Sequence, residues 1–342
     1  MPILTGTNWN WNLEHVMRWN ERGKNFKNKL SPILFPNTQI VTLGSCFMRY
    51  LTDAMVRQNL NCIMHPSGLY YSSSSIRQEF ERVFEPIGNT ITEDIWKTDQ
   101  GYMHPHKSYF EFFKTPEALK KWSQEIDEKT TGLFRKADVF VIILGLIEVW
   151  MNEKTKTVYR HMPPPSIIAE NGISLSRLTV KEMLEDLEKI YKIIKMYTNA
   201  DVILGVSPVP MNATMTDLDV RIANIESKSR IRAAVSEFIE EHPDVFYFHS
   251  YEIVATAEKP MDFMLEDGRH LSKTAFDYIT NQFLQVFASD EIVIKEIDSS
   301  WIAPPTKLAL RPKRSFIQRL PKSRKEFLSI IKKIKKTKPK RT

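Results

Sequence analysis

The chain has 342 residues, 42% of them hydrophobic and 26% charged, which is an ordinary balance for a soluble protein with a sizeable core. The net charge is +7, and the only cysteines are Cys46 and Cys62, too few for a disulfide-stabilised fold. The first 21 residues are polar and no apolar run is long enough to cross a bilayer, so we expect a cytoplasmic protein rather than a secreted or membrane-spanning one.

Apolar runs alternate with segments of helical period along most of the chain. The apolar runs predict strands at residues 39–43, 61–64, 139–144, 202–206 and 245–248. The helical segments lie at residues 47–58, 74–83, 116–129, 180–197, 220–240 and 273–287. Such alternation is typical of an α/β fold in which a mostly parallel sheet is covered by helices on both faces, a three-layer α/β/α sandwich.

The same pattern suggests one main domain with appendages. We assign the domain to residues 37–290, an N-terminal arm to residues 1–36 and a basic C-terminal tail to residues 291–342. Residues 84–115 show no clear period, so we interpret them as an insertion that could form a wall of the site.

Two short motifs, far apart in sequence, contain the residues of an acyl-transfer site. Ser45 lies between the first predicted strand and the first predicted helix, on a turn that can expose a hydroxyl and surround it with backbone N–H groups. A serine hydroxyl needs a general base to act as a nucleophile at neutral pH. His270 can be that base, and either Asp267 or a backbone carbonyl can hold its imidazole in one tautomer. Alone, the second motif is more often a polar turn before a helix, but together the motifs predict the catalytic set Ser45, Asp267 and His270.

Gly44-Ser45-Cys46-Phe47 resembles the signature of the GSCFA family, a branch of the SGNH hydrolases. Further blocks that resemble this family lie at residues 66–71, 144–150, 207–210 and 223–229, so the similarity spans about residues 39 to 285. The resemblance implies an SGNH-type or flavodoxin-like sandwich, with the nucleophile near the start and Asp-x-x-His near the end. We expect no cofactor.

The resemblance also implies an oxyanion hole formed by the backbone N–H groups of Ser45 and Gly68. SGNH enzymes usually add an Asn from a Gly-x-Asn-Asp block, but here the matching stretch, residues 145–148, has no amide side chain, and Asn224 is a candidate substitute. Glu148 would repel an oxyanion unless it is protonated or turned away, and ordering a loop is an equally good role for it. The candidates for the substrate pocket are Gly145, Glu148, His106 and Ser207.

Three other groups of side chains allow more than one interpretation. Cys46 could supply a thiolate at a helix N-terminus, although we favour a small buried apolar role. His104 and His106 flank one proline without a third ligand at a recognisable spacing, so we expect no metal site. The cluster of Lys228, Arg230 and Arg232 could neutralise an acidic sugar, but such residues more often form the solvated face of a helix.

The basic tail is a candidate for contact with a membrane. Residues 307–342 contain 15 Lys or Arg and one acidic residue, for a charge of +14, whereas the rest of the chain has 33 basic and 40 acidic residues. Apolar residues recur there at helical spacing, at Phe327, Ile330, Ile331 and Ile334. A basic amphipathic helix suits the anionic inner face of a membrane, and a solvated tail is an equally good interpretation. Nucleic acid is not an expected partner, because this charge lies outside the folded body.

These features predict a serine-dependent esterase or O-acyltransferase. Hydrolysis and transfer share one acyl-enzyme and differ in the acceptor that reaches it. The family resemblance, which we associate with bacterial surface polysaccharides, implies an acyl ester of a carbohydrate as the substrate. Two other functions stay open: a catalytically silent glycan-binding module, favoured by Ile147 in place of the family's Thr, and a membrane-associated scaffold that acts through the tail.

Overall fold

The computed structural model describes residues 32–86, 95–108, 111–257, 260–295 and 329. Nearly all of the predicted N-terminal arm therefore lies outside the described residues, and so does the predicted amphipathic helix of the tail, apart from residue 329. Among the helices of the described part, none is both long enough and apolar enough to cross a bilayer.

Five parallel strands form the central sheet, in the order β10-β9-β5-β1-β2. They are β1 (Ile40–Gly44), β2 (Cys62–Met64), β5 (Val139–Leu144), β9 (Asp201–Val206) and β10 (Val245–Phe248). Each coincides with a predicted strand. All residues of β5 are buried, and they alternate between the two faces: Ile142 packs into one helical layer and Val141 into the other. This double burial is why the strands are continuous apolar runs.

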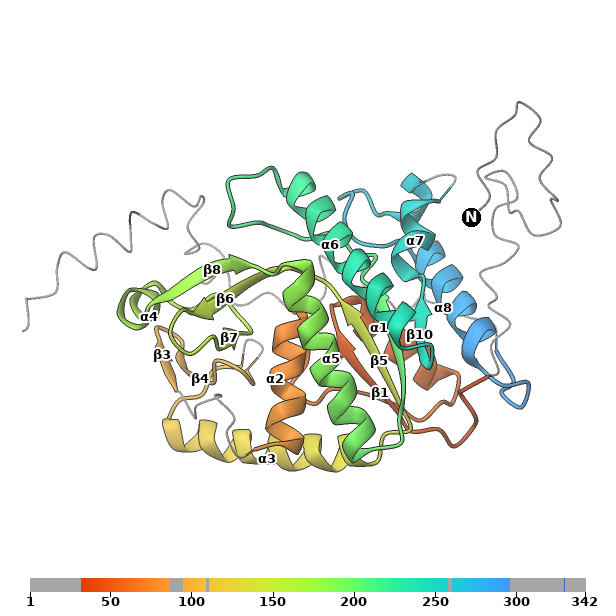
Figure 1. Ribbon diagram of the computed structural model, residues 1–342, viewed down its shortest axis with the longest axis horizontal. Helices are drawn as coiled ribbons and strands as arrows, with labels where there is room; N and C mark the ends of the chain where they lie inside the picture. The colour runs from red at the N-terminus through yellow and green to blue at the C-terminus, as the bar shows by residue number, and fades with distance from the viewer. Residues whose placement is uncertain (1–31, 87–94, 109–110, 258–259, 296–328, 330–342) are drawn as a thin grey trace, which may run out of the picture.

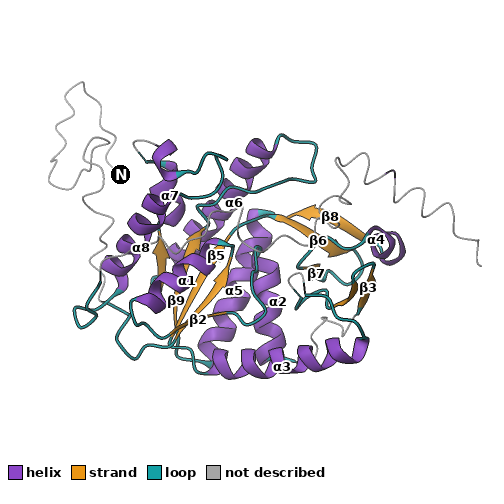
Figure 2. Ribbon diagram, turned by 180° about the vertical axis from the view of Figure 1, so that it is seen from behind, coloured by secondary structure: helices purple, strands orange, loops and turns teal. Residues whose placement is uncertain are grey.

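Helices cover both faces of the sheet, as Figures 1 and 2 show. One face is covered by α2 (Ser73–Phe84), α5 (Val180–Tyr197), α6 (Val220–Glu241) and the C-terminal end of α3 (Pro116–Arg135). The other is covered by α1 (Phe47–Arg57), α7 (Ser250–Ala255) and α8 (Lys273–Phe287). The prediction of a three-layer α/β/α fold is therefore confirmed.

Two small antiparallel sheets, which the sequence did not predict, lie together at the end of the molecule away from α8 (Figure 1). One contains β6 (Glu148–Asn152), β7 (Val158–Tyr159) and β8 (Ile173–Arg177), and the other pairs β3 (Trp96–Thr98) with β4 (Gly101–Met103). Beside them lies α4 (Pro165–Asn171), and a 3-10 helix (Pro260–Phe263) precedes α8. The small sheets share an apolar core that includes Trp96, Tyr159 and Ile173.

Candidate active site

Ser45 lies on a sharp turn between β1 and α1, at the carboxyl edge of the sheet. Gly44 has a φ of +139°, and a Cβ at this position would lie 2.2 Å from the Ile143 carbonyl oxygen, so the turn requires glycine. The Ser45 hydroxyl donates to Ser207 Oγ over 2.8 Å, and Ser207 Oγ also accepts from the backbone N–H of Val209 at 3.3 Å. Ser45 is only 2% exposed. The turn therefore holds the predicted nucleophile in one place, bonded to a second serine that follows β9.

Asp267 and His270 form a tightly held pair just before α8. Asp267 Oδ1 accepts the backbone N–H groups of Arg269 and His270, at 3.0 and 2.9 Å, and Oδ2 lies 2.5 Å from His270 Nδ1. Gly268 adopts a φ of +63°, which lets the chain turn so tightly. Burial raises the pKa of Asp267, but the hydrogen bonds from His270 and Arg269 together outweigh it and lower that pKa to about 2.

The hydrogen bonds of His270 define its tautomer. Arg269 Nη1 lies 2.7 Å from His270 Nε2, and a guanidinium can only donate. Nε2 is therefore the acceptor, and the ring proton lies on Nδ1, facing Asp267. This is the tautomer that a general base acting through Nε2 requires.

The packing of α1 against α8 brings the two motifs to the same edge of the fold. Phe276 of α8 stacks on Phe47 of α1 with ring centroids 6.0 Å apart, and it also contacts Tyr50 at 4.6 Å. Ser45 and His270 immediately precede these two helices. The hydrogen bond that we predict between them is not present among the described residues, because Ser45 donates to Ser207 and His270 Nε2 accepts from Arg269.

The two predicted oxyanion N–H groups are both engaged by carbonyl oxygens. Ser45 N–H donates to Ile143 at 3.1 Å, and Gly68 N–H closes a tight turn onto His65 at 2.9 Å. Both groups are engaged in this structure, so their role in binding a substrate oxygen stays a prediction. Asn224 Oδ1 accepts from the backbone of Met211 at 3.0 Å, while its amide nitrogen has no partner among the described residues. Asn224 therefore stays a predicted donor.

Gly145 separates Ser45 from Tyr71. A Cβ on Gly145 would lie 3.2 Å from Ser45 Cβ and 3.2 Å from the Tyr71 ring, so a larger residue here would press on both side chains. Its N–H donates to the Tyr71 carbonyl at 2.8 Å, and its own carbonyl accepts from Lys228 Nζ at 3.0 Å. Next to it, the Ile147 N–H donates to a side chain of α6, Ser227 Oγ, at 3.0 Å. Helix α6 thus holds the turn behind Ser45, the predicted nucleophile.

Lys228 is 1% exposed, so its assignment to a solvated helix face is wrong. Burial lowers the pKa of Lys228 to about 7. The buried residues of α6 recur at positions 223, 227, 231, 234 and 238, and Lys228 lies next to this stripe, at the spacing of Ile231 and Val235. That periodicity is the signal by which the sequence could have placed Lys228 inside.

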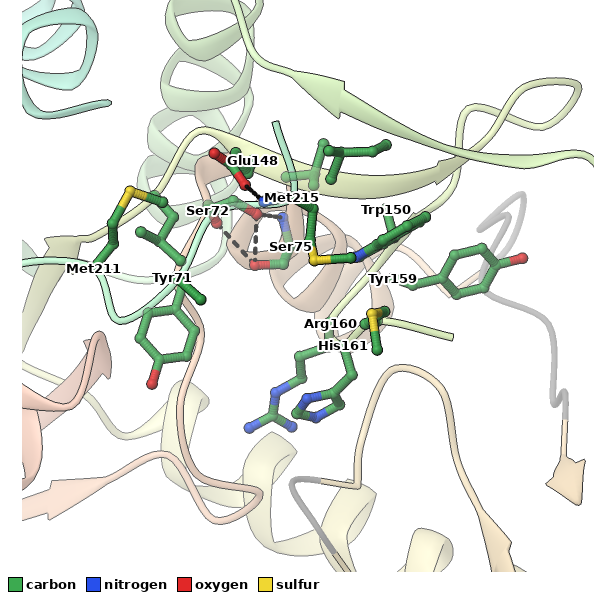
Figure 3. A pocket seen from close by; sticks show the side chains of 15 residues that line it. Tyr71, Ser72, Ser75, Glu148, Trp150, Tyr159, Arg160, His161, Met211 and Met215 are labelled. Atoms are coloured by element: carbon green, nitrogen blue, oxygen red, sulfur yellow. Dashed lines mark hydrogen bonds between the residues drawn. The ribbon is translucent and has the colours of Figure 1, made fainter. Parts of the chain in front are cut away.

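A cavity of about 260 Å³ has Tyr71 and Leu146 in its wall, both next to Gly145, whereas Ser45, Asp267 and His270 are not among the residues that line it. Figure 3 shows Tyr71 and Met211 on one side and Trp150 and Tyr159 on the other, with Arg160 and His161 below. The remaining lining residues are Ser72, Ser75, Glu148, Val149, Met162, Leu175, Ala213 and Met215. The cavity is therefore amphipathic, with aromatic faces and a small number of polar groups.

The walls of this cavity differ in part from those predicted. Of the four pocket candidates, Glu148 lines the cavity, whereas Gly145 and Ser207 contact Ser45 instead. His106 does not line it: the ring is buried and stacks on Tyr159 at 5.2 Å. The described part of segment 84–115 likewise supports the wall from behind, through the shared core of the small sheets, and does not line it.

Glu148 holds the loop that closes one side of the cavity. Its carboxylate accepts the hydroxyl of Thr214 and, at 3.2 Å, the backbone N–H of Met215 (Figure 3). The loop-ordering role is thus the one that the contacts support. Glu148 is also the first residue of strand β6.

Replacing Glu148 with Ala is expected to loosen this loop without removing the chemistry at Ser45. Two hydrogen bonds to a charged group are lost, so we expect amide hydrogen exchange at Met215 to accelerate by about tenfold or more. Exchange followed by mass spectrometry measures this. Glu226→Ala, which removes a carboxylate of α6 that pairs with Arg177 and Arg230, is the matched control. Equal exchange at Met215 in both variants would contradict the assignment.

Cys46, which caps α1, is half-buried and packs against the second core. Burial raises the pKa of the Cys46 thiol more than the neighbouring cations lower it, which favours the apolar role over a thiolate. His104 and His106 are buried, and within the described part of the chain neither is grouped with further metal-ligating side chains.

Comparisons with known proteins identify the family. Nothing among curated proteins matches the chain. Among solved structures, the chain is similar to the crystal structure of a "putative GDSL-like lipase" from Parabacteroides merdae ATCC 43184, with 12% identity, a TM-score of 0.39, and coverage of 75% of this chain and 98% of the other. That likeness is too weak to carry an argument about function. The model of the GSCFA family matches residues 39–283, which include Ser45, Asp267 and His270. The chain therefore belongs to the GSCFA family.

Proposed function

We propose that this protein is a serine-dependent esterase or O-acyltransferase with Ser45 as the nucleophile. The observation that carries the proposal is the hydrogen bond between His270 Nδ1 and Asp267, which is 2.5 Å long. This pair lies beside the contact between α1 and α8, at the same edge of the sheet as the Ser45 hydroxyl. A fixed imidazole tautomer and a serine on a strand-to-helix turn are the elements of acyl transfer.

In the proposed reaction, Ser45 Oγ forms a bond to the acyl carbon while its proton passes to His270 Nε2. The ester's alkoxide then leaves and takes that proton, so an acyl-Ser45 remains. Water or an acceptor hydroxyl then gives its proton to His270 and attacks the acyl carbon. The bond between the acyl carbon and Ser45 Oγ breaks, and His270 returns the proton to Ser45 Oγ. Two contacts must open first: the Ser45 hydroxyl has to leave Ser207, and Arg269 has to leave His270 Nε2.

The cavity supports a carbohydrate as the group that carries the acyl ester, including a unit of a surface polysaccharide. Trp150, Tyr159 and Tyr71 line this cavity of about 260 Å³ with aromatic surface. Arg160 and His161 line it too, and their side chains are bonded to the backbone carbonyls of Leu69 and Ser108. Apolar walls with a few placed polar groups are the common composition of small-molecule sites.

A direct test is to incubate the full chain with O-acetylated monosaccharides and to follow acetate release and acetyl transfer to an added sugar. A fluorophosphonate in parallel, with the adduct located by mass spectrometry, reports on the nucleophile. We expect turnover of at least one acetylated sugar and an adduct on Ser45. Sugar binding without turnover or adduct would instead identify a silent glycan-binding module.

A further inference from the structure

The base proposed for catalysis is blocked in this structure by the residue before it. Arg269 Nη1 donates to His270 Nε2 over 2.7 Å, and this is the nitrogen that must accept the Ser45 proton. The backbone of both residues is fixed by Asp267 Oδ1, so the main chain cannot easily carry Arg269 away. Only a movement of the Arg269 side chain can free His270.

Arg269 contacts no carboxylate within the described part of the chain, in contrast to several other half-buried arginines. Arg77, Arg82 and Arg232 each contact a carboxylate. The Arg269 guanidinium contacts only the neutral imidazole of His270, and its Nε is buried without any partner among the described residues. A guanidinium is best satisfied by a carboxylate or phosphate that it can bind through two parallel hydrogen bonds.

The guanidinium also lies close to the nucleophile turn. Burial raises the pKa of the Cys46 thiol, and the charges of Arg269, Lys228 and Arg49 act on it in the opposite direction, with Arg269 the strongest. Asp267, the carboxylate nearest in sequence, uses its oxygens for His270 and the backbone. The surroundings of Ser45 and Cys46 thus carry several cations, which favours a negative charge beside them.

We propose that Arg269 is a positioning residue that blocks His270 until an anionic group of the substrate draws its guanidinium away, so that the site favours acyl esters of acidic sugars. The inference rests on the proposed function. The bond from Arg269 Nη1 to His270 Nε2 breaks, the guanidinium binds the sugar carboxylate, and Nε2 becomes free to accept the Ser45 proton. A neutral ester lacks this partner and meets a blocked base.

The test compares O-acetyl glucuronate with O-acetyl glucose, which differ by the carboxylate. In the wild-type chain we expect kcat/KM for the acidic ester to exceed that for the neutral ester by about tenfold or more, the usual scale of one charge-assisted hydrogen bond. Arg269→Met should remove this preference by raising turnover of the neutral ester and lowering that of the acidic one. Arg269→Lys keeps the charge and should restore part of the preference. Arg221→Met, at an exposed arginine of α6, is the matched control and should behave as wild type.

Nitrogen NMR of histidine-labelled protein gives a readout that does not depend on turnover. Adding glucuronate, which is not a substrate, should shift the His270 Nε2 resonance in the wild type but not in Arg269→Met, and glucose should shift neither. The proposal would be overturned if folded Arg269→Met protein lost turnover of both esters equally, or if it kept the wild-type preference for the acidic ester. Were the wild type to bind glucuronate through Arg269 yet show no turnover and no Ser45 adduct, the anion contact would stand and the proposed enzymatic function would fall.

Discussion

Ser45→Ala is expected to lower ester turnover by about a thousandfold or more, because it deletes the oxygen that forms the acyl-enzyme. Fluorophosphonate labelling should disappear with it. The fold should persist, since the change removes one hydrogen bond to Ser207, a loss of about 1 kcal/mol in the free energy of unfolding. Initial rates on an acetylated sugar and circular dichroism on the same preparation measure both effects.

Ser207→Ala is the matched control for this prediction. It breaks the same 2.8 Å hydrogen bond but leaves the Ser45 hydroxyl in place. We expect it to retain labelling at Ser45 and to lose far less activity. An adduct that moves to Cys46 in the Ser45→Ala protein, with turnover retained, would instead make the neighbouring thiol the nucleophile.

The sequence predicted the central sheet well because its inner strands β1, β5 and β9 are buried on both faces. Such a strand, β5 for example, appears as an unbroken apolar run whatever its partners are. Strands β6, β7 and β8 lack this signal: β7 has two residues, and β6 has one buried residue among five. Their structure depends on pairing with each other and on the core around Tyr159, which no local pattern reveals.

The same distinction applies to the site. The positions of Ser45 and His270 at helix starts follow from local patterns, and the fold places both at one edge. The contacts of the two side chains do not follow from local patterns. Ser45 contacts Ser207, which is 162 residues away in the sequence. His270 contacts its neighbour Arg269 only because the Arg269 side chain adopts one particular rotamer. The engagement of Gly68 N–H by the His65 carbonyl is likewise a property of the folded turn.

Lys228→Met is expected to increase the free energy of unfolding at neutral and acid pH. Burial lowers the pKa of Lys228 to about 7 from an ordinary value of 10.5, so the folded state is penalised for holding the charge. Below about pH 7 Lys228 is protonated in both the folded and the unfolded chain. Burying its charge then costs the folded state on the order of 3 to 5 kcal/mol in the free energy of unfolding. Methionine fills a similar volume without a charge and gives up only the hydrogen bond to Gly145, about 1 kcal/mol.

The sign of the pH dependence makes the prediction specific. Between pH 7 and 10.5 the unfolded chain binds more protons at Lys228 than the folded one, so stability of the wild type relative to the variant rises with pH. Urea unfolding of both proteins at about pH 6, 8 and 9.5 measures the free energy of unfolding. The difference between Lys228→Met and the wild type should become smaller as the pH rises. Cys46 also interacts with Lys228, so the comparison is repeated in a Cys46→Ser background. A constant difference across the series would mean that Lys228 keeps its charge in the folded state.

A buried lysine that weakens the fold is expected to serve the site it touches. Lys228 Nζ donates to the carbonyl of Gly145, and Gly145 lies against Ser45, so the ammonium holds the turn behind the proposed nucleophile. In the proposed reaction its positive charge would stabilise the developing oxyanion. The more stable Lys228→Met protein should therefore be the less active one, with kcat reduced and labelling of Ser45 slowed. Activity that rises together with stability would show that the lysine contributes nothing to the reaction, and the clamp on Gly145 would then be a matter of folding alone.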